Sequence, residues 1–136
     1  MERVIFACVH NAGRSQMAAA FFDAIADPAR ATAVSAGTEP ANRIHPEVIE
    51  VMREIGIDLR AKQPQRITEA LARNASLLVT MGCGDECPYV PGLERADWPL
   101  RDPKDRPLAE VRAIRDEIRD RVCELVDARG WGRAAL

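Results

Sequence analysis

Apolar residues gather in short runs along this chain, and the spacing within each run predicts a strand or a helix. Residues 3–8 read RVIFAC, an apolar run with Val, Ile and Phe that is typical of a buried strand. Residues 32–37, TAVSAG, and 75–82, ASLLVTMG, have the same character, and residues 94–100, ERADWPL, supply a short fourth strand. Four strands are therefore predicted.

Between these runs, apolar residues recur at every third or fourth position, as they do on one face of a helix. Four helices are predicted: from Ser15 to about Ala26, from Pro46 to Gly56, a short one with the sequence TEALAR that starts at Thr68, and from Leu108 to about Ala128. Gly130 lies just past the end of the last helix. The residues expected on the inward faces of the first two helices are Met17, Phe21, Ala24, Ile25, Val48, Ile49, Met52 and Ile55.

Strands that alternate with helices predict an α/β fold, a single-domain four-stranded parallel sheet with helices on both faces, Rossmann-like in its arrangement. A length of 136 residues fits one domain over residues 1–136. Ligands of such sheets bind at the carboxyl ends of the strands, so the loops after Ala7, Met81 and Leu100 are expected to share one edge.

The composition is that of a globular protein, with 47% hydrophobic and 29% charged residues and a net charge of -2. This balance gives no general attraction to nucleic acid or to anionic membranes, so neither is expected as a partner. No apolar run approaches the roughly 20 residues of a membrane span, and the first residues lack a signal-peptide pattern. We expect a cytoplasmic monomer whose cysteines stay reduced and are open to catalysis or metal binding.

The first predicted strand ends at Cys8, and five residues separate it from Arg14: Val9, His10, Asn11, Ala12 and Gly13. A helix follows at once. The backbone N–H groups of such a loop, together with a helix N-terminus, suit a tetrahedral oxyanion, and the Arg14 guanidinium would hold two of its oxygens. The same positive field favours the thiolate of Cys8, which makes it a nucleophile toward the bound anion.

Two polar side chains are expected to support this loop. The Ser15 hydroxyl is placed to hydrogen-bond the Cys8 sulfur, and the Asn11 amide to hold the loop in shape. A nucleotide-binding Walker A loop is excluded, because the first glycine and the lysine of that pattern are missing. Cys8 alone reads as a buried strand-end cysteine, but with Arg14, Ser15 and Gly13 the functional interpretation is the stronger one.

Five segments of the chain resemble arsenate reductases of the low-molecular-weight protein tyrosine phosphatase superfamily: VIFACVHNAGRSQMA, VSAGTEP, VMREIGIDL, LLVTMGCGDECP and ADWPLRDP. The resemblance runs from about Arg3 to Leu125. It implies the fold of that superfamily, arsenate as the substrate with phosphate or sulfate as analogues, and no bound cofactor. It also implies an external thiol reductant, either thioredoxin or mycothiol or another low-molecular-weight thiol.

Asp102, which precedes Pro103, is the candidate general acid. Its residue type and position fit a solvated turn aspartate equally well, and the resemblance implies the catalytic role, protonation of the departing oxygen. The chain continues KDRP, without the aromatic residues that contact the phosphotyrosyl ring in the phosphatases. A small inorganic oxyanion therefore fits better than an aryl phosphate.

The resemblance further implies an electron relay in which Cys83 attacks the Cys8 sulfur, arsenite leaves, and Cys87 then attacks Cys83. Only three residues separate Cys83 from Cys87, fewer than in the thioredoxin-coupled pattern, so their order and the final reductant stay open. Half a zinc site is the competing interpretation of the pair, but a second pair of ligands is lacking and no metal is expected. Cys123 has no motif around it.

Two rivals of the reductase remain: a phosphatase for phosphate monoesters, which needs neither Cys83 nor Cys87, and a non-catalytic arsenic or redox sensor. The resemblance also suggests a potassium site, because some thioredoxin-coupled members of the family hold potassium near this loop. Asn11 and Ser35 match its ligands, but the first helix has alanines where the acidic ligand would stand, so no strong potassium site is expected.

Overall fold

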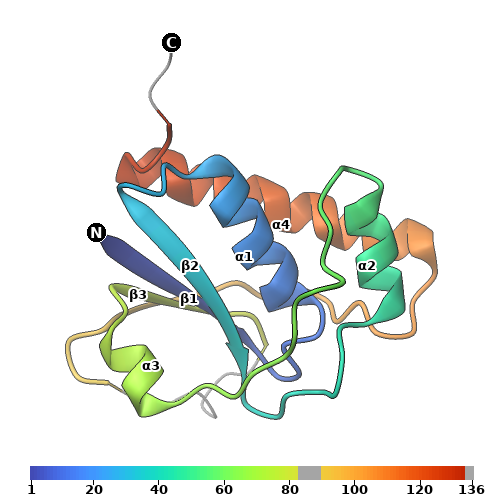
Figure 1. The fold of residues 1–136 in the computed structure, drawn as a ribbon, viewed down its shortest axis with the longest axis horizontal. Coiled ribbons are helices and arrows are strands. Elements are labelled where there is room, and N and C mark those ends of the chain that lie inside the picture. The colour runs from blue at the N-terminus through green and yellow to red at the C-terminus, as the bar shows by residue number, and fades with distance from the viewer. Residues whose placement is uncertain (83–89, 134–136) are drawn as a thin grey trace.

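Four parallel strands in the order β2-β1-β3-β4 form the sheet of the computed structural model, which describes residues 1–82 and 90–133 (Figure 1). The strands are β1 (Glu2–Cys8), β2 (Ala31–Gly37), β3 (Leu77–Thr80) and β4 (Glu94–Asp97). β1 pairs with β2 and with β3, and β3 pairs with the edge strand β4. The predicted four-stranded parallel sheet is confirmed.

The helices begin and end at recognisable signals. They are α1 (Arg14–Ile25), α2 (Pro46–Arg53), α3 (Glu69–Arg73) and α4 (Leu108–Arg129). Pro46 opens α2 at the first helical position, where a missing N–H costs nothing. The Thr68 hydroxyl caps α3 by accepting a bond from the Leu71 N–H at 3.1 Å, and Gly130 ends α4 in the left-handed conformation.

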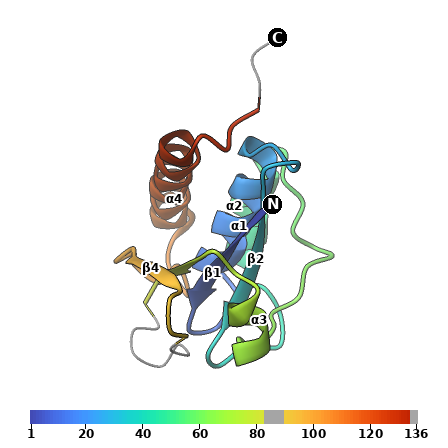
Figure 2. The ribbon, with the colours of Figure 1, turned by 90° about the vertical axis from the view of Figure 1, so that its left-hand side faces the viewer.

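Side chains of β1 alternate between two apolar clusters, one on each face of the sheet. Val4 and Phe6 point into a large cluster that is covered by α1, α2 and α4. Ile5 and Ala7 point into a smaller cluster that includes Ala72 of α3. Figure 2 shows α3 and α4 on opposite sides of the sheet. The prediction of helices on both faces is therefore confirmed.

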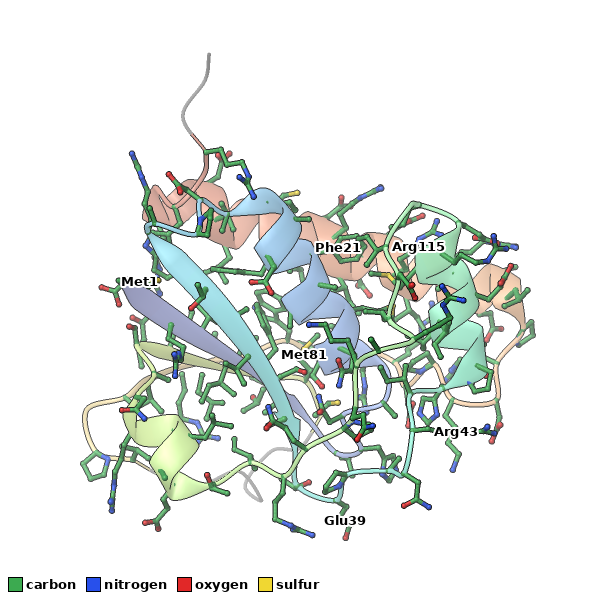
Figure 3. All side chains as sticks on the ribbon, viewed as in Figure 1. Met1, Phe21, Glu39, Arg43, Met81 and Arg115 are labelled. Carbon is green, nitrogen blue, oxygen red and sulfur yellow. The ribbon has the colours of Figure 1, made fainter. Side chains whose placement is uncertain are left out.

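Two predicted inward residues were wrong. Ala24 is exposed and Phe22 is buried in its place, because α1 packs against both the sheet and α4 and so buries a wider arc than one stripe. Ile55 is exposed because α2 stops at Arg53, two residues before it, and the chain turns toward Gly56. The side chains that fill the space between helices and sheet are drawn in Figure 3.

No helix within residues 1–82 and 90–133 is long and apolar enough to cross a membrane. The parallel strands all end at one edge of the sheet. The segments that follow β1, β3 and β4 therefore begin side by side, and they carry the residues of the candidate site.

Candidate active site

Cys8 is the last residue of β1, and its side chain is buried at the mouth of the loop 9–13. Its sulfur lies 2.9 Å from Ser15 Oγ, the contact that the sequence predicts. Asn11 Nδ2 donates to the same Ser15 oxygen at 2.7 Å. Because the amide uses a lone pair of that oxygen, the hydroxyl proton is free to point at the sulfur.

The loop is held in shape by Asn11, which is completely buried and has a positive φ of 49°. Its Oδ1 accepts bonds from the backbone N–H of Gln65 at 2.9 Å and from Gln16 Nε2 at 3.2 Å. Asparagine is one of the few residues with a side chain that tolerate this backbone region. The segment around Gln65 therefore supports the loop from behind, across 54 positions of sequence.

The N-terminus of α1 faces the loop with its own backbone donors. Its first residue is Arg14, Gly13 is the N-cap, and neither a side-chain cap nor an acidic residue of the first turn neutralises the helix end. The first N–H groups of a helix have no partner within it, and the helix dipole adds a partial positive charge there. The loop and the helix end together suit a tetrahedral anion next to Cys8.

Arg14 joins the segments that follow β1, β3 and β4. Only 7% of the residue is exposed, and its Nη1 donates to the Leu100 carbonyl at 3.1 Å. A Cβ atom on Gly82, which has φ +104°, would lie 2.4 Å from the same nitrogen. Gly82 follows β3 and Leu100 follows β4, so the predicted meeting of these loops at one edge of the sheet is confirmed.

Asp102 lies opposite Arg14, with Oδ2 3.9 Å from Arg14 Nη2 and a side chain that is 43% exposed. The Lys104 N–H donates to its Oδ1 at 3.0 Å. The neighbouring Pro103 packs on the anion loop, because a Cβ on Gly13 would come within 2.7 Å of Pro103 Cγ. A carboxyl group in this place is partly open to solvent and beside the anion loop, as a proton donor to a departing oxygen must be.

The two histidines of the chain lie at the rim of the loop. His10 Nδ1 contacts the Glu39 carbonyl at 3.1 Å, and the His45 N–H donates to the Ala12 carbonyl at 3.0 Å. Burial lowers the pKa of His45, while the carboxylates of Glu47 and Asp102 raise it to a smaller extent. The bond from the His45 backbone N–H to the Ala12 carbonyl links the start of α2 to the anion loop.

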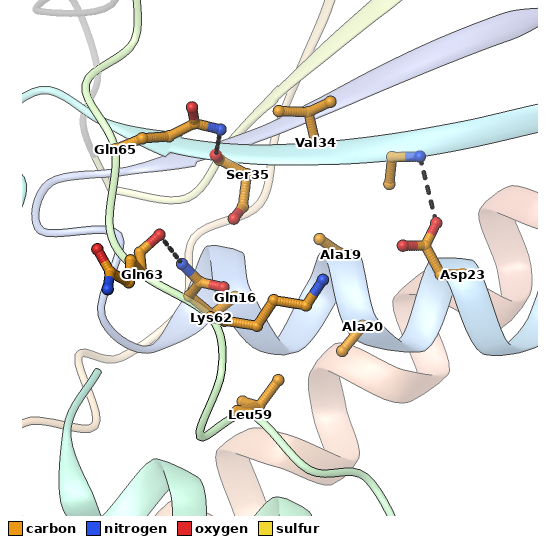
Figure 4. Close-up of a pocket in the computed structure, with 11 residues that line it drawn as sticks. Gln16, Ala19, Ala20, Asp23, Val34, Ser35, Leu59, Lys62, Gln63 and Gln65 are labelled. Atoms are coloured by element: carbon orange, nitrogen blue, oxygen red, sulfur yellow. Dashed lines mark hydrogen bonds between the residues drawn. The ribbon is translucent and has the colours of Figure 1, made fainter. Parts of the chain in front are cut away.

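A polar cavity of about 220 Å³ lies behind the loop, between α1, β2 and the segment 59–65 (Figure 4). Gln16 forms part of its wall and donates to the Gln63 carbonyl at 3.3 Å. Lys62 extends along α1 toward Asp23, whose pKa is raised by burial and lowered in smaller part by the Ala33 N–H and by Lys62.

The cavity bears on the expected absence of a potassium site. Ser35 lines it, and Ala19 and Ala20 of α1 stand in its wall without a carboxylate. The Asn11 amide oxygen is already bonded to Gln65 and Gln16. Asp23, which the sequence reasoning overlooked, is the acid that α1 does bring to this cavity, and Lys62 lies beside it. The absence of a strong potassium site stays a prediction.

Cys83 and Cys87 lie outside the residues that the structure describes, so the relay stays a prediction. Cys123 is exposed on α4. Among residues 1–82 and 90–133, no three His, Cys, Asp or Glu side chains cluster as metal ligands would.

Sequence reasoning missed the roles of Gly82, Gln16 and Gln65 in supporting the site. The position of Gly82 directly after a central strand is a weak sequence signal for a role at the site. The two glutamines have no such signal, because glutamine side chains are usually solvated.

Comparisons with known proteins place this site in a family. The family model of low molecular weight phosphotyrosine protein phosphatases matches residues 3–130. An arsenate reductase of Staphylococcus aureus is 35% identical over 123 residues, which are 87% of this chain and 91% of that protein. A glutaredoxin arsenate reductase of Synechocystis sp. is 32% identical over 129 residues, 93% of this chain and 97% of that protein.

Among solved structures, the thioredoxin-dependent arsenate reductase of Corynebacterium glutamicum superposes with a TM-score of 0.81 at 38% identity. The match covers 94% of this chain and 61% of that one, so this chain spans less than two thirds of that protein. The loop from Cys8 to Ser15, the fold around it and these matches agree: the chain belongs to the low molecular weight phosphotyrosine protein phosphatase family, and its relatives include arsenate reductases.

Proposed function

We propose that the protein is an arsenate reductase that converts arsenate to arsenite at Cys8. The observation that carries the proposal is the arrangement around the Cys8 sulfur, which contacts Ser15 Oγ at 2.9 Å below an uncapped helix N-terminus, with Arg14 and Asp102 opposite each other beside it. The curated relatives named above, which cover most of the chain, are arsenate reductases.

In the first step, the Cys8 thiolate attacks the arsenic of an arsenate held by the loop N–H groups and by Arg14. An S–As bond forms, and one As–O bond breaks. Asp102 donates its proton to the departing hydroxyl group of arsenate, which leaves as water. The arsenic is still As(V) in the resulting Cys8 adduct, because no electrons have yet been transferred.

Reduction follows when a second thiolate attacks the Cys8 sulfur. The S–As bond then breaks with its electron pair on arsenic, so that As(V) becomes As(III) and a disulfide forms. We propose Cys83 as this second thiolate. Cys87 would next attack Cys83, freeing Cys8 and leaving a Cys83–Cys87 disulfide for the external reductant.

The reductant is proposed to be a dithiol protein of the thioredoxin type. Relatives named as thioredoxin-dependent and as glutaredoxin arsenate reductases support a thiol-disulfide partner. A low-molecular-weight thiol such as mycothiol would instead attack the Cys8 adduct directly. Reduced thiols are maintained in the cytoplasm, where we expect the protein to work as a monomer.

Phosphate-monoester hydrolysis is the second candidate, because the matching family is described as phosphotyrosine phosphatases. Attack by Cys8, anion binding by Arg14 and proton donation by Asp102 serve both reactions. The aromatic side chains within residues 1–82 and 90–133 favour the reductase, because all of them pack in the core rather than at the site: Phe6, Phe21, Phe22, Trp98 and Trp131.

A double substitution, Cys83→Ser with Cys87→Ser, separates the candidates. A reductase with the internal relay loses thioredoxin-coupled arsenite production and keeps any hydrolysis of phenyl phosphate. A phosphatase shows hydrolysis in both forms and no arsenite in either, and a sensor shows neither activity. Cys123→Ser is the matched control, since Cys123 is exposed on α4 and has no role in the proposed relay.

A further inference from the structure

The segment that carries Asp102 is tied to helix α2 by a side chain for which the proposed chemistry has no role. Glu47, in the first turn of α2, accepts a hydrogen bond at Oε1 from the backbone N–H of Asp105 at 3.1 Å. The two residues are 58 positions apart. The bond therefore fixes the acid-bearing turn against another element of the fold.

The first turn of α2 is itself fixed to the anion loop. The His45 N–H donates to the Ala12 carbonyl at 3.0 Å. A Cβ on Gly13 would meet Pro103 Cγ at 2.7 Å on one side and His45 Cδ2 at 3.4 Å on the other. Three segments thus meet at Gly13: the anion loop, the start of α2, and the turn that follows Asp102.

The turn from Asp102 to Arg106 has a conformation that needs support. Asp105 has φ +59°, a left-handed backbone that costs free energy for a residue with a side chain. The turn nevertheless sets the place of the acid. The Lys104 N–H holds the Asp102 carboxylate at 3.0 Å, and Arg106 Nε donates to the Asp102 carbonyl. If Asp105 relaxed to a right-handed backbone, Arg106 would be redirected and its contact with the Asp102 carbonyl would be lost.

We propose that Glu47 is a positioning residue for Asp102: by accepting the Asp105 N–H, it holds the turn in the left-handed form that places the Asp102 carboxyl beside the anion loop. This inference rests on the proposed function, in which Asp102 is the proton donor. Glu47 touches neither the anion nor Cys8 in this account. Small displacements of a proton donor lower the rate of the step it serves without weakening substrate binding.

The test measures single-turnover formation of the Cys8 adduct in the full chain. Glu47→Ala is expected to lower the rate at saturating arsenate about three- to tenfold, the range expected for loss of one ordinary intramolecular hydrogen bond. The half-saturating arsenate concentration is expected to stay within about twofold, because the anion loop and Arg14 are unchanged. Glu47→Gln keeps an oxygen acceptor and should retain most of the rate.

Two further variants separate positioning from a general effect on the fold. Glu69→Ala is the control, because Glu69 is also a glutamate in the first turn of a helix, but it is exposed and lies away from the site. Asp105→Gly in the Glu47→Ala background is expected to recover part of the rate, since glycine adopts a positive φ without steric cost. In an Asp102→Asn background, Glu47→Ala should have almost no further effect.

The inference is overturned if Glu47→Ala and Glu69→Ala have equal rates, or if Glu47→Ala lowers the rate as strongly in the Asp102→Asn background. Failure of the proposed function looks different, because the unsubstituted protein would then form no arsenite. In that case the same variants are compared on phenyl phosphate, whose leaving oxygen also needs a proton. The same pattern of rates is expected there, and its absence would refute the role of Glu47.

Discussion

At the scale of single residues, the site depends on glycines as much as on the groups that would react. Gly82 allows the Arg14 guanidinium to pass close to the backbone after β3, and Gly13 allows Pro103 to pack on the anion loop. A side chain at either position would push the acid-bearing turn or the arginine away. The reactive groups are thus held by close backbone approach.

Substitution of Gly82 by alanine tests this statement. The new Cβ would lie 2.4 Å from Arg14 Nη1, so we expect the rate of arsenate turnover to fall at least about tenfold, because a displaced guanidinium no longer holds the anion. Gly92→Ala is the control, since Gly92 also has a positive φ but nothing within 4 Å of the added atom. Equal activity of the two variants would contradict the role assigned to Gly82.

Residue roles differed in how far the sequence could predict them. Cys8, Ser15 and Arg14 are close in sequence at a strand-to-helix junction, so their mutual contact follows from local geometry. The partners of Arg14 and Asn11 do not, because Leu100 and Gln65 are 86 and 54 residues away. Such contacts depend on the strand order, which the apolar pattern alone does not give.

At the scale of elements, α2 illustrates why helix ends are difficult to predict. Its apolar pattern continues to Ile55, but the helix ends at Arg53, and the Ile55 N–H bonds to Met52 rather than to Val51. The Val51 carbonyl is instead bonded by Arg115 Nη1 of α4 at 2.9 Å. A side chain from a distant helix therefore completes the last turn of α2.

Removal of that side chain should loosen the contact between α2 and α4. Arg115 lies at this contact (Figure 3), and its side chain is 10% exposed. Arg115→Met leaves the Val51 carbonyl without the Arg115 donor. We expect a loss of about 1–3 kcal/mol in the free energy of unfolding, measured by urea denaturation. Arg112→Met is the control, because Arg112 bonds the Glu54 carboxylate rather than a backbone carbonyl of α2, and its side chain is 43% exposed. A larger loss for Arg112→Met would contradict this account.

The cavity between α1, β2 and the segment 59–65 is the place where the absence of a strong potassium site can be tested. Because Ala19 and Ala20 offer no oxygen ligand and the Lys62 side chain already brings a cation toward Asp23, we expect no strong binding of potassium there. Replacing sodium by potassium at low millimolar concentration should change neither the melting temperature nor the arsenate turnover. A marked increase of either in potassium would show the prediction to be wrong.

At the scale of the whole molecule, the fold was largely readable from the sequence. β1 and β3 are apolar runs bounded by turn residues, and their burial on both faces is what a parallel sheet requires. The strand order and the wider buried arc of α1 were not readable, since both depend on how the helices pack after the sheet has formed. The carboxyl-edge rule did predict that the segments after β1, β3 and β4 meet at one edge of the sheet.

Folding stability should depend on pH through His45. Burial lowers its pKa in the folded state from the ordinary value of 6.5, so the unfolded chain binds a proton first as the pH falls. The free energy of unfolding therefore decreases from about pH 7 as the pH falls through 6.5, and this part of the slope ends below the lowered pKa. His45→Gln should remove it, as seen in urea denaturation at several pH values.

The control is His10→Gln, which removes the other histidine of the chain. That variant should keep most of the slope between pH 7 and pH 6, because the His45 ring remains half-buried beside Glu47 and Asp102. If His10→Gln flattened the slope and His45→Gln did not, the titrating group would have been misassigned.

The central claim, that Cys8 begins an internal reduction of arsenate, is tested most directly without any external reductant. The reduced protein is mixed with arsenate, the free thiols and the arsenite are counted, and the peptides that carry Cys8, Cys83 and Cys87 are analysed by mass spectrometry. The account predicts one arsenite per chain, the loss of two thiols and a Cys83–Cys87 disulfide. Arsenite that appears only after a small thiol is added would contradict the internal relay, and no arsenite with any thiol reductant would contradict the reductase itself.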